Sequence, residues 1–150
     1  MIVGFPATQL HTDRAPAARR IPSASVAHAT FCSRCASRLR FYTDVLGFRK
    51  KHDIPVGEYR WITVTSPEGP DDVELALEPN ANPAGKAFQT AMFTQGIPVA
   101  AFEVGDLAGE FKRLTGHGVV FTKEPMAAGP VHLAVFADTC GNLIQIYQRA

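Results

Sequence analysis

The sequence has few of the features that mark secreted, membrane or nucleic-acid-binding proteins. It contains three cysteines, Cys32, Cys35 and Cys140, and this small odd number does not indicate a disulfide-stapled secreted domain. We therefore expect reduced thiols and a cytoplasmic protein. The formal net charge is only +1, which argues against nucleic-acid binding through phosphate contacts. No apolar run approaches the roughly 20 residues that span a bilayer, so we expect no membrane segment.

The N-terminal part of the chain differs in composition from the rest. Residues 1–40 contain six arginines, no lysine and one acidic residue. Residues 1–22 show no hydrophobic period and are interrupted by three prolines, so we expect a flexible or loosely docked arm. The remaining residues, 23–150, have enough apolar side chains to bury one core and are expected to form a single domain.

Two successive segments predict the same order of elements: a strand, a helix and three strands. In the first segment these cover residues 25–31, 38–46, 49–54, 59–65 and 73–77. In the second they cover residues 99–104, 106–114, 119–123, 131–137 and 143–147, with Asp106 as the helix N-cap. Residues 79–86 are expected to be a polar connector broken by proline. The repeat predicts an α+β fold of two βαβββ modules, about residues 23–80 and 97–149, around a shared cleft.

Three motifs occur in the order and spacing of a known superfamily. They are Phe41-Tyr42-Thr43-Asp44-Val45-Leu46-Gly47-Phe48 at the first helix, Val73-Glu74-Leu75 at the fourth strand, and Asp138-Thr139-Cys140-Gly141-Asn142-Leu143-Ile144-Gln145 at the last hairpin. Together they resemble the vicinal-oxygen-chelate superfamily, the glyoxalase, bleomycin-resistance and dioxygenase group, over about residues 39–148. The resemblance implies a curved mixed sheet around a cleft and a homodimer. It also implies a small-molecule ligand.

The resemblance further implies a divalent metal, such as Zn, Ni, Mn or Fe, held by residues on the first, fourth, fifth and eighth strands. Glu74 falls on the fourth-strand position and is the candidate metal ligand and catalytic carboxylate. The fifth-strand position falls on Val99, which cannot bind a metal. The eighth falls on Gln145, whose amide oxygen brings no charge. The first falls on Ala27, with His28 one residue out of register. The metal site is therefore expected to be incomplete.

Other side chains are expected to line the cleft and contact a ligand. Trp61 and Thr63 oppose the apolar Ile62 and Val64, and Tyr147 shares a strand face with Gln145. On residues 131–137 we expect Val131, Leu133 and Val135 to face the core. That alternation leaves His132 on the cleft face as an acid–base candidate. Each residue also has a plainer interpretation, as a pocket-wall carboxylate, a structural amide or an ordinary strand histidine.

Two function classes remain open from the sequence. The first is a protein that binds or sequesters a small organic molecule without full metal chemistry. The second is a metal-dependent lyase, isomerase or dioxygenase with a reduced ligand set. The resemblance starts abruptly near Leu39, and the family's usual acidic turn before the helix is replaced by a segment that contains Cys32 and Cys35. This raises the hypothesis that residues 1–38 are read from a shifted frame, which the coding DNA would test.

Overall fold

The structure is a computed structural model that describes residues 30–32, 35–70 and 73–150, without the side chains of residues 31–37. The predicted arm over residues 1–22 lies outside the described residues. So do His28 and most of the predicted first strand.

The first module has the predicted order of elements. Its elements are β1 (Thr30–Cys32), α1 (Cys35–Arg40), the π-helical turn η1 (Phe41–Val45), β2 (Arg49–Val56), β3 (Tyr59–Thr65) and β4 (Leu75–Pro79). The strands form a four-stranded sheet in the order β1-β4-β3-β2. Within it β1 runs parallel to β4 and the other neighbours are antiparallel. Gly47 follows η1 with φ of 82°, a conformation that favours glycine, and the helical segment ends next to the boundary at residue 46 that the sequence predicts.

The second module repeats this topology. Its elements are β5 (Ala100–Glu103), α3 (Leu107–Gly116), β6 (Phe121–Ala128), β7 (Val131–Ala137) and β8 (Leu143–Arg149). The sheet order is β5-β8-β7-β6, again with one parallel pair, β5 with β8. The side chain of Asp106 accepts a hydrogen bond from the Gly109 amide at 2.9 Å, so the predicted N-cap of this helix is confirmed. The α+β fold of two βαβββ modules is therefore confirmed.

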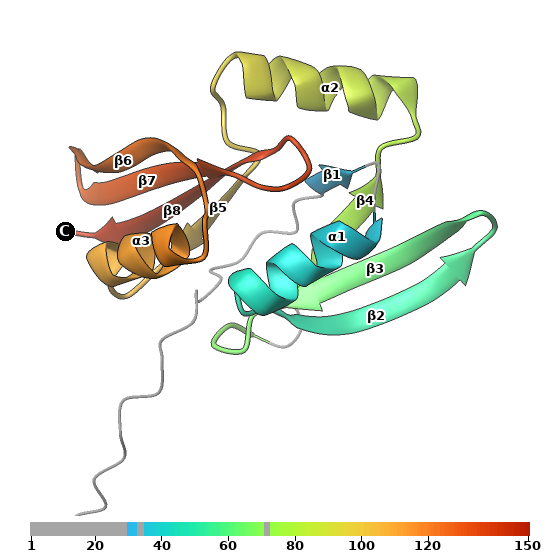
Figure 1. Cartoon of the computed structure of the whole chain (residues 1–150), viewed down its shortest axis with the longest axis horizontal. Coiled ribbons are helices and arrows are strands. Elements are labelled where there is room, and N and C mark those ends of the chain that lie inside the picture. The colour runs from blue at the N-terminus through green and yellow to red at the C-terminus, as the bar shows by residue number, and fades with distance from the viewer. Residues whose placement is uncertain (1–29, 33–34, 71–72) are drawn as a thin grey trace, which may run out of the picture.

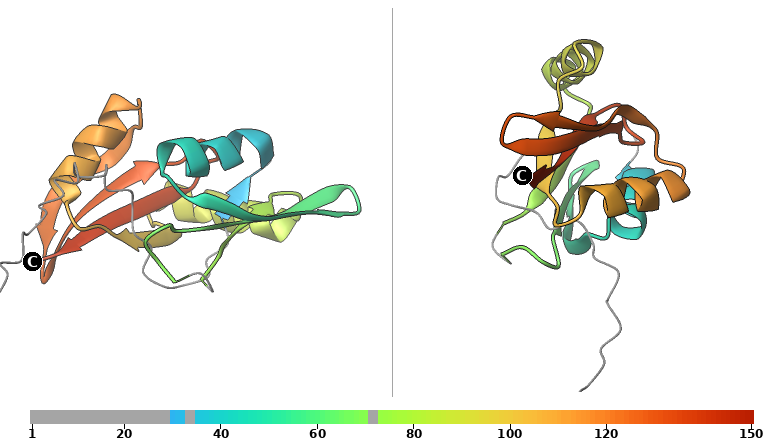
Figure 2. Two further views of the ribbon diagram at one scale, coloured as in Figure 1. Left: turned by 90° about the horizontal axis from the view of Figure 1, so that it is seen from below. Right: turned by 90° about the vertical axis from the view of Figure 1, so that its left-hand side faces the viewer.

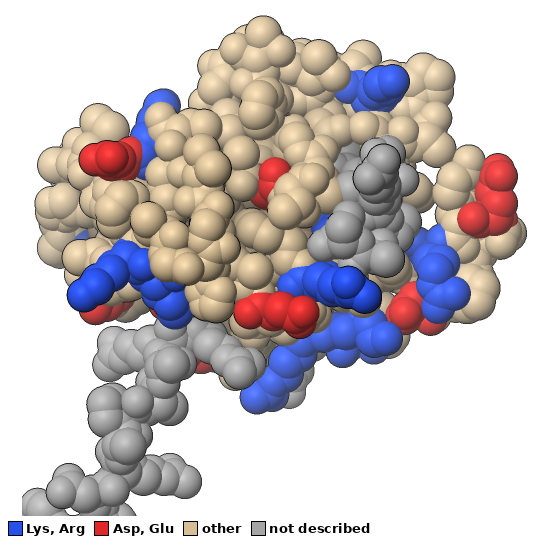
Figure 3. Space-filling view, viewed as in Figure 1, with Lys and Arg blue, Asp and Glu red and all other residues tan. Residues whose placement is uncertain are grey.

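A helix, α2 (Pro83–Thr94), joins the modules where the sequence analysis predicted a polar connector at residues 79–86. That prediction is wrong. Asn82 caps the helix by accepting a hydrogen bond from the Ala84 amide, and Pro83 occupies the first turn, where proline is tolerated. The helix was missed because it has no ordinary apolar stripe: Gln89 is buried whereas Phe88 and Phe93 are exposed. In Figure 1 α2 stands apart from both sheets, and Figure 3 shows almost no charged side chains over it.

The core lies between the sheets and the helices α1, η1 and α3, which cover the same side of the two sheets (Figures 1 and 2). Aromatic rings join the modules across this core. The ring centroids of Phe41 and Phe136 lie 6.3 Å apart, and those of Phe48 and Phe102 lie 5.2 Å apart. Because the helix of one module packs on strands of the other, the two modules share one hydrophobic core. None of the described helices is long and apolar enough to cross a membrane.

A buried polar network ties the last hairpin to both modules. Asp138 Oδ1 accepts hydrogen bonds from the backbone amides of Cys140 and Asn142, each at 2.8 Å. Asp138 Oδ2 accepts from Asn142 Nδ2 at 2.7 Å and from the Tyr42 hydroxyl at 3.3 Å. Burial, and then the Asp138 charge, raise the pKa of Tyr42 well above its usual value, so the phenol stays protonated and can donate. Gln89 of α2 donates to Asn142 Oδ1 at 3.0 Å and completes the network.

Cys140, in the same hairpin, is disulfide-bonded. The expectation of three reduced thiols is therefore wrong for this cysteine. The side chains of Cys32 and Cys35 lie outside the described part of the chain. Disulfides rarely persist in a reducing cytoplasm, so this disulfide does not support the predicted cytoplasmic location. The location stays a prediction.

Candidate functional site

Glu74 lies immediately before β4 on the side of the first sheet that faces away from α1. Leu75 and Leu77 are buried in the core, whereas Ala76 pairs with Thr63 on the opposite side of the sheet. We call this side of both sheets, turned away from α1 and α3, the far face. Because side chains alternate along a strand, Glu74 shares the far face with Ala76 and Thr63.

Two basic side chains from β2 converge on Glu74. Lys51 Nζ lies 2.9 Å from Glu74 Oε1, and His52 Nε2 lies 3.7 Å from the same oxygen. The Thr63 hydroxyl and then the Lys51 ammonium hold the pKa of Glu74 below its ordinary value. The carboxylate is therefore kept charged and is already paired with a cation. No sequence pattern identifies Lys51 or His52 as partners of Glu74, because their orientation depends on an irregularity in β2.

The remainder of the far face on the first sheet is apolar and partly exposed. Trp61 pairs with Ile54, and Tyr59 pairs with Val56, at the outer end of the β2–β3 hairpin. Trp61, the single tryptophan of the chain, is 45% exposed. Thr63, by contrast, is buried. The exposed indole offers an apolar contact to a ligand at the outer end of the hairpin.

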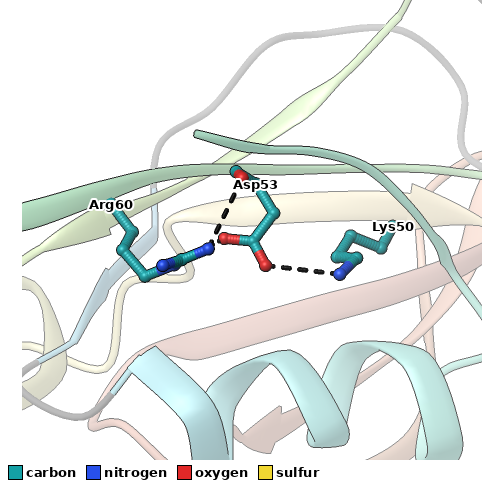
Figure 4. A network of polar contacts seen from close by, with 3 residues as sticks. All are labelled: Lys50, Asp53 and Arg60. Atoms are coloured by element: carbon teal, nitrogen blue, oxygen red, sulfur yellow. Dashed lines mark hydrogen bonds and ion pairs between the residues drawn. The ribbon is translucent and has the colours of Figure 1, made fainter. Parts of the chain in front are cut away.

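The acidic and basic residues of the β2–β3 hairpin form a second, separate network. Asp53 lies between Lys50, at 3.2 Å, and Arg60, at 2.7 Å (Figure 4). The Arg60 guanidinium is the main cause of a lowered pKa of Asp53, and Lys50 adds to it. Lys50 therefore has its own carboxylate, whereas Lys51, the next residue, pairs with Glu74.

Gln145 and Tyr147 lie on the far face of the second sheet. Gln145 pairs with Val135 on one side and Ala101 on the other, while Ile144 and Ile146 face the core. The Tyr147 hydroxyl donates to Glu103 Oε2 at 3.4 Å. The sequence candidates thus fall on the far faces of two different sheets, Glu74, Trp61 and Thr63 on one and Gln145 and Tyr147 on the other.

His132 does not lie on the far face, so the predicted face is wrong. Ala134 and Phe136 of β7 belong to the core, and His132, two residues before Ala134, lies on the same face of the strand as both of them. His132 also pairs with Gln148, whose Oε1 accepts a hydrogen bond from the Leu107 amide at the start of α3. Leu133 and Val135 are the far-face residues. The error arose because both faces of this strand carry apolar residues, so composition could not tell them apart.

The donor set does not fit a complete divalent metal site. Within the described residues no three His, Cys, Asp or Glu side chains come together as metal ligands would. Val99, just before β5, carries no donor atom, Gln145 offers a neutral amide, and Glu74 already faces an ammonium group. His28 lies outside the described residues.

A groove along α2 does not involve the candidate residues. It has a volume of about 540 Å³ and is lined only by residues of that helix and its end: Pro83, Lys86, Ala87, Thr90, Ala91, Thr94 and Gln95. The sequence candidates on the far faces are therefore not part of this groove.

Comparisons with known proteins agree with this fold. The model of the Glyoxalase/Bleomycin resistance protein/Dioxygenase superfamily matches residues 25–146. The uncharacterized protein YurT of Bacillus subtilis (strain 168) is 53% identical over 111 residues, which cover 74% of this chain and 87% of YurT. The crystal structure of UcmS2 superposes with a TM-score of 0.68 at 29% identity, over 83% of this chain and 97% of UcmS2. That of TnmS3, described as an antibiotic binding protein from Streptomyces sp. CB03234, gives 0.62 at 22% identity, over 85% and 98%.

The family match spans most of the chain, and the repeated βαβββ topology is the one that the three sequence motifs imply. The chain therefore belongs to the glyoxalase/bleomycin resistance protein/dioxygenase superfamily, the vicinal-oxygen-chelate group.

Proposed function

We propose that this protein binds a small organic molecule in a cleft between the far faces of its two modules, without a complete metal site. The donor set carries this proposal. Val99 provides no donor where the family resemblance places a metal-binding histidine, and the retained Glu74 is paired with Lys51. TnmS3, a protein of the same fold, is described as an antibiotic binding protein, which supports a small organic ligand for this chain. The ligand itself would be identified by screening.

Trp61 provides the direct test of ligand binding. Since it is the single tryptophan and is 45% exposed on the far face, its fluorescence should change when a compound found by the screen binds. Trp61→Ala should weaken the binding of that compound about tenfold, measured by calorimetry, because apolar contact with the indole is lost. Phe93→Ala is a matched control, since Phe93 on α2 is 43% exposed and lies away from the far face. Equal losses in the two variants would show that the far face is not the binding surface.

A metal-dependent lyase, isomerase or dioxygenase is the second candidate function. The observation that favours it is Glu74, a charged carboxylate kept on the far face at the position that the family resemblance assigns to a metal ligand. In such an enzyme a bound metal would polarise the oxygens of the substrate, and Glu74 would help to hold it. Metal analysis separates this function from the first.

We also propose that the protein is a homodimer. The outer β2–β3 hairpin exposes Ile54, Val56 and Tyr59, each at least 43% exposed, and β2 and β6 are open sheet edges. A second copy of the chain could cover this apolar surface and complete a cleft. Light scattering at high micromolar concentration should give twice the monomer mass. A monomer mass under those conditions would contradict the proposal.

A further inference from the structure

The side chains that meet Glu74 are set by a bulge in β2. Lys50 pairs with Val64 and His52 pairs with Thr63, so the register of the β2–β3 ladder shifts by one residue at Lys51. In a regular strand Lys51 would oppose Thr63, and His52 would point toward the helices. The bulge instead turns His52 to the far face and leaves Lys51 there as well, and both contact Glu74 Oε1.

We propose that Lys51 supplies, at Glu74, the positive charge that a divalent metal would otherwise supply, and that the bulge in β2 thereby makes the far face metal-independent. This inference rests on the proposed function, because it takes the far face around Glu74 as the ligand site. It goes further by assigning to Lys51 the exclusion of a metal ion from the Glu74 carboxylate.

Distance and charge favour this assignment. A metal ion bound to a carboxylate oxygen lies about 2.0–2.2 Å from it. Lys51 Nζ lies 2.9 Å from Glu74 Oε1, so a metal on that oxygen would have to displace the ammonium group or bind beside a like charge. The pair is partly shielded from water, since the side chains of Lys51 and Glu74 are 32% and 27% exposed. Solvent therefore screens the repulsion only in part.

The neighbouring lysine provides a matched control. Lys50 is one residue away and has the same charge, but it pairs with Asp53 rather than with Glu74 (Figure 4). If only the overall charge of the hairpin excluded a metal, removing either lysine would have the same effect. If the ammonium at Glu74 excludes it, only removal of Lys51 matters.

Calorimetric titration with Ni²⁺ alone tests this assignment. The unmodified protein, Lys50→Met and Lys51→Arg should show no saturable binding of Ni²⁺ at Glu74. Lys51→Met should bind Ni²⁺ saturably, at least tenfold more tightly than the weakest binding the titration can detect, because Glu74 and His52 then face the ion without a competing cation. The added variant Glu74→Gln should remove the gain. In NMR spectra of Lys51→Met, paramagnetic broadening by Ni²⁺ should centre on residues 51–53, 63 and 74.

Each outcome separates the assignment from the proposed function. If the unmodified protein is metal-free and Lys51→Met gains no affinity, the role of Lys51 is refuted and the binding function stands. The role is also refuted if Lys51→Arg gains as much as Lys51→Met, since shape rather than charge would then matter. Tight binding of Ni²⁺ by the unmodified protein, lost in Glu74→Ala, would instead refute the proposed function. Lys51→Gln replaces Lys51→Met if circular dichroism shows that the methionine variant is unfolded.

Discussion

Asp138→Ala should lower the free energy of unfolding by about 3–5 kcal/mol. Asp138 accepts four hydrogen bonds, from the backbone amides of Cys140 and Asn142, from Asn142 Nδ2 and from the Tyr42 hydroxyl. Tyr42 and Asn142 are almost fully buried, so their donors cannot turn to water when the carboxylate is removed. An unsatisfied buried donor costs about 1–3 kcal/mol, and the charged acceptor makes each lost bond stronger. Urea unfolding measures the loss.

The same substitution at Asp106 is the control for this experiment. Asp106 is exposed and caps α3 through a single hydrogen bond to the Gly109 amide. Asp106→Ala should therefore cost only about 1 kcal/mol, the usual value of an N-cap. If Asp138→Ala is no more destabilising than Asp106→Ala, the buried network does not connect the modules as described.

The double variant Val99→His with Gln145→Glu should gain a transition-metal site. The two changes restore an imidazole and a carboxylate at the positions that the family resemblance assigns to metal ligands. Val99 lies immediately before β5, and Gln145 lies within β8, which pairs with β5. With two added donors, one of them anionic, the ion can displace the Lys51 ammonium from Glu74. Since Glu74 is on the other sheet, the gain requires the two far faces to meet in one cleft. Calorimetry with Zn²⁺ or Ni²⁺ should show saturable, roughly stoichiometric binding.

Glu74→Ala in the double variant is the control, and it should weaken the new site by at least tenfold, because one of its anionic ligands is lost. If neither the double variant nor the unmodified protein binds metal, the assignment of Glu74, Val99 and Gln145 to a common cleft is wrong.

The parts of the fold that local sequence rules control were predicted well. The capping side chain of Asp106, the stop at Gly47 and the alternation that puts Glu74 opposite Leu75 and Leu77 each depend on a few neighbouring residues. Because the same local order occurs twice, the sequence also predicted two modules of equal topology.

The parts that depend on tertiary contacts were not predicted. In the helix α2 a glutamine, Gln89, is buried and aromatic residues are exposed. Its sequence therefore lacks the apolar stripe, with a period of about 3.6 residues, that predicts a helix. His132 was placed on the wrong face because β7 is apolar on both sides. The bulge at Lys51 has no sequence marker, and a shift of one residue moves a side chain across the sheet. The charged pair at Glu74 could therefore be found only in three dimensions.

The metal content of the unmodified protein tests the central claim most directly. When the protein is purified without added metal and titrated with Ni²⁺ or Zn²⁺, we predict well under one equivalent of bound ion and no saturable binding. The reason is the donor set, in which Glu74 is paired with Lys51 and Gln145 is neutral. Stoichiometric, tight binding that is lost in Glu74→Ala would contradict the account and favour a metal-dependent enzyme.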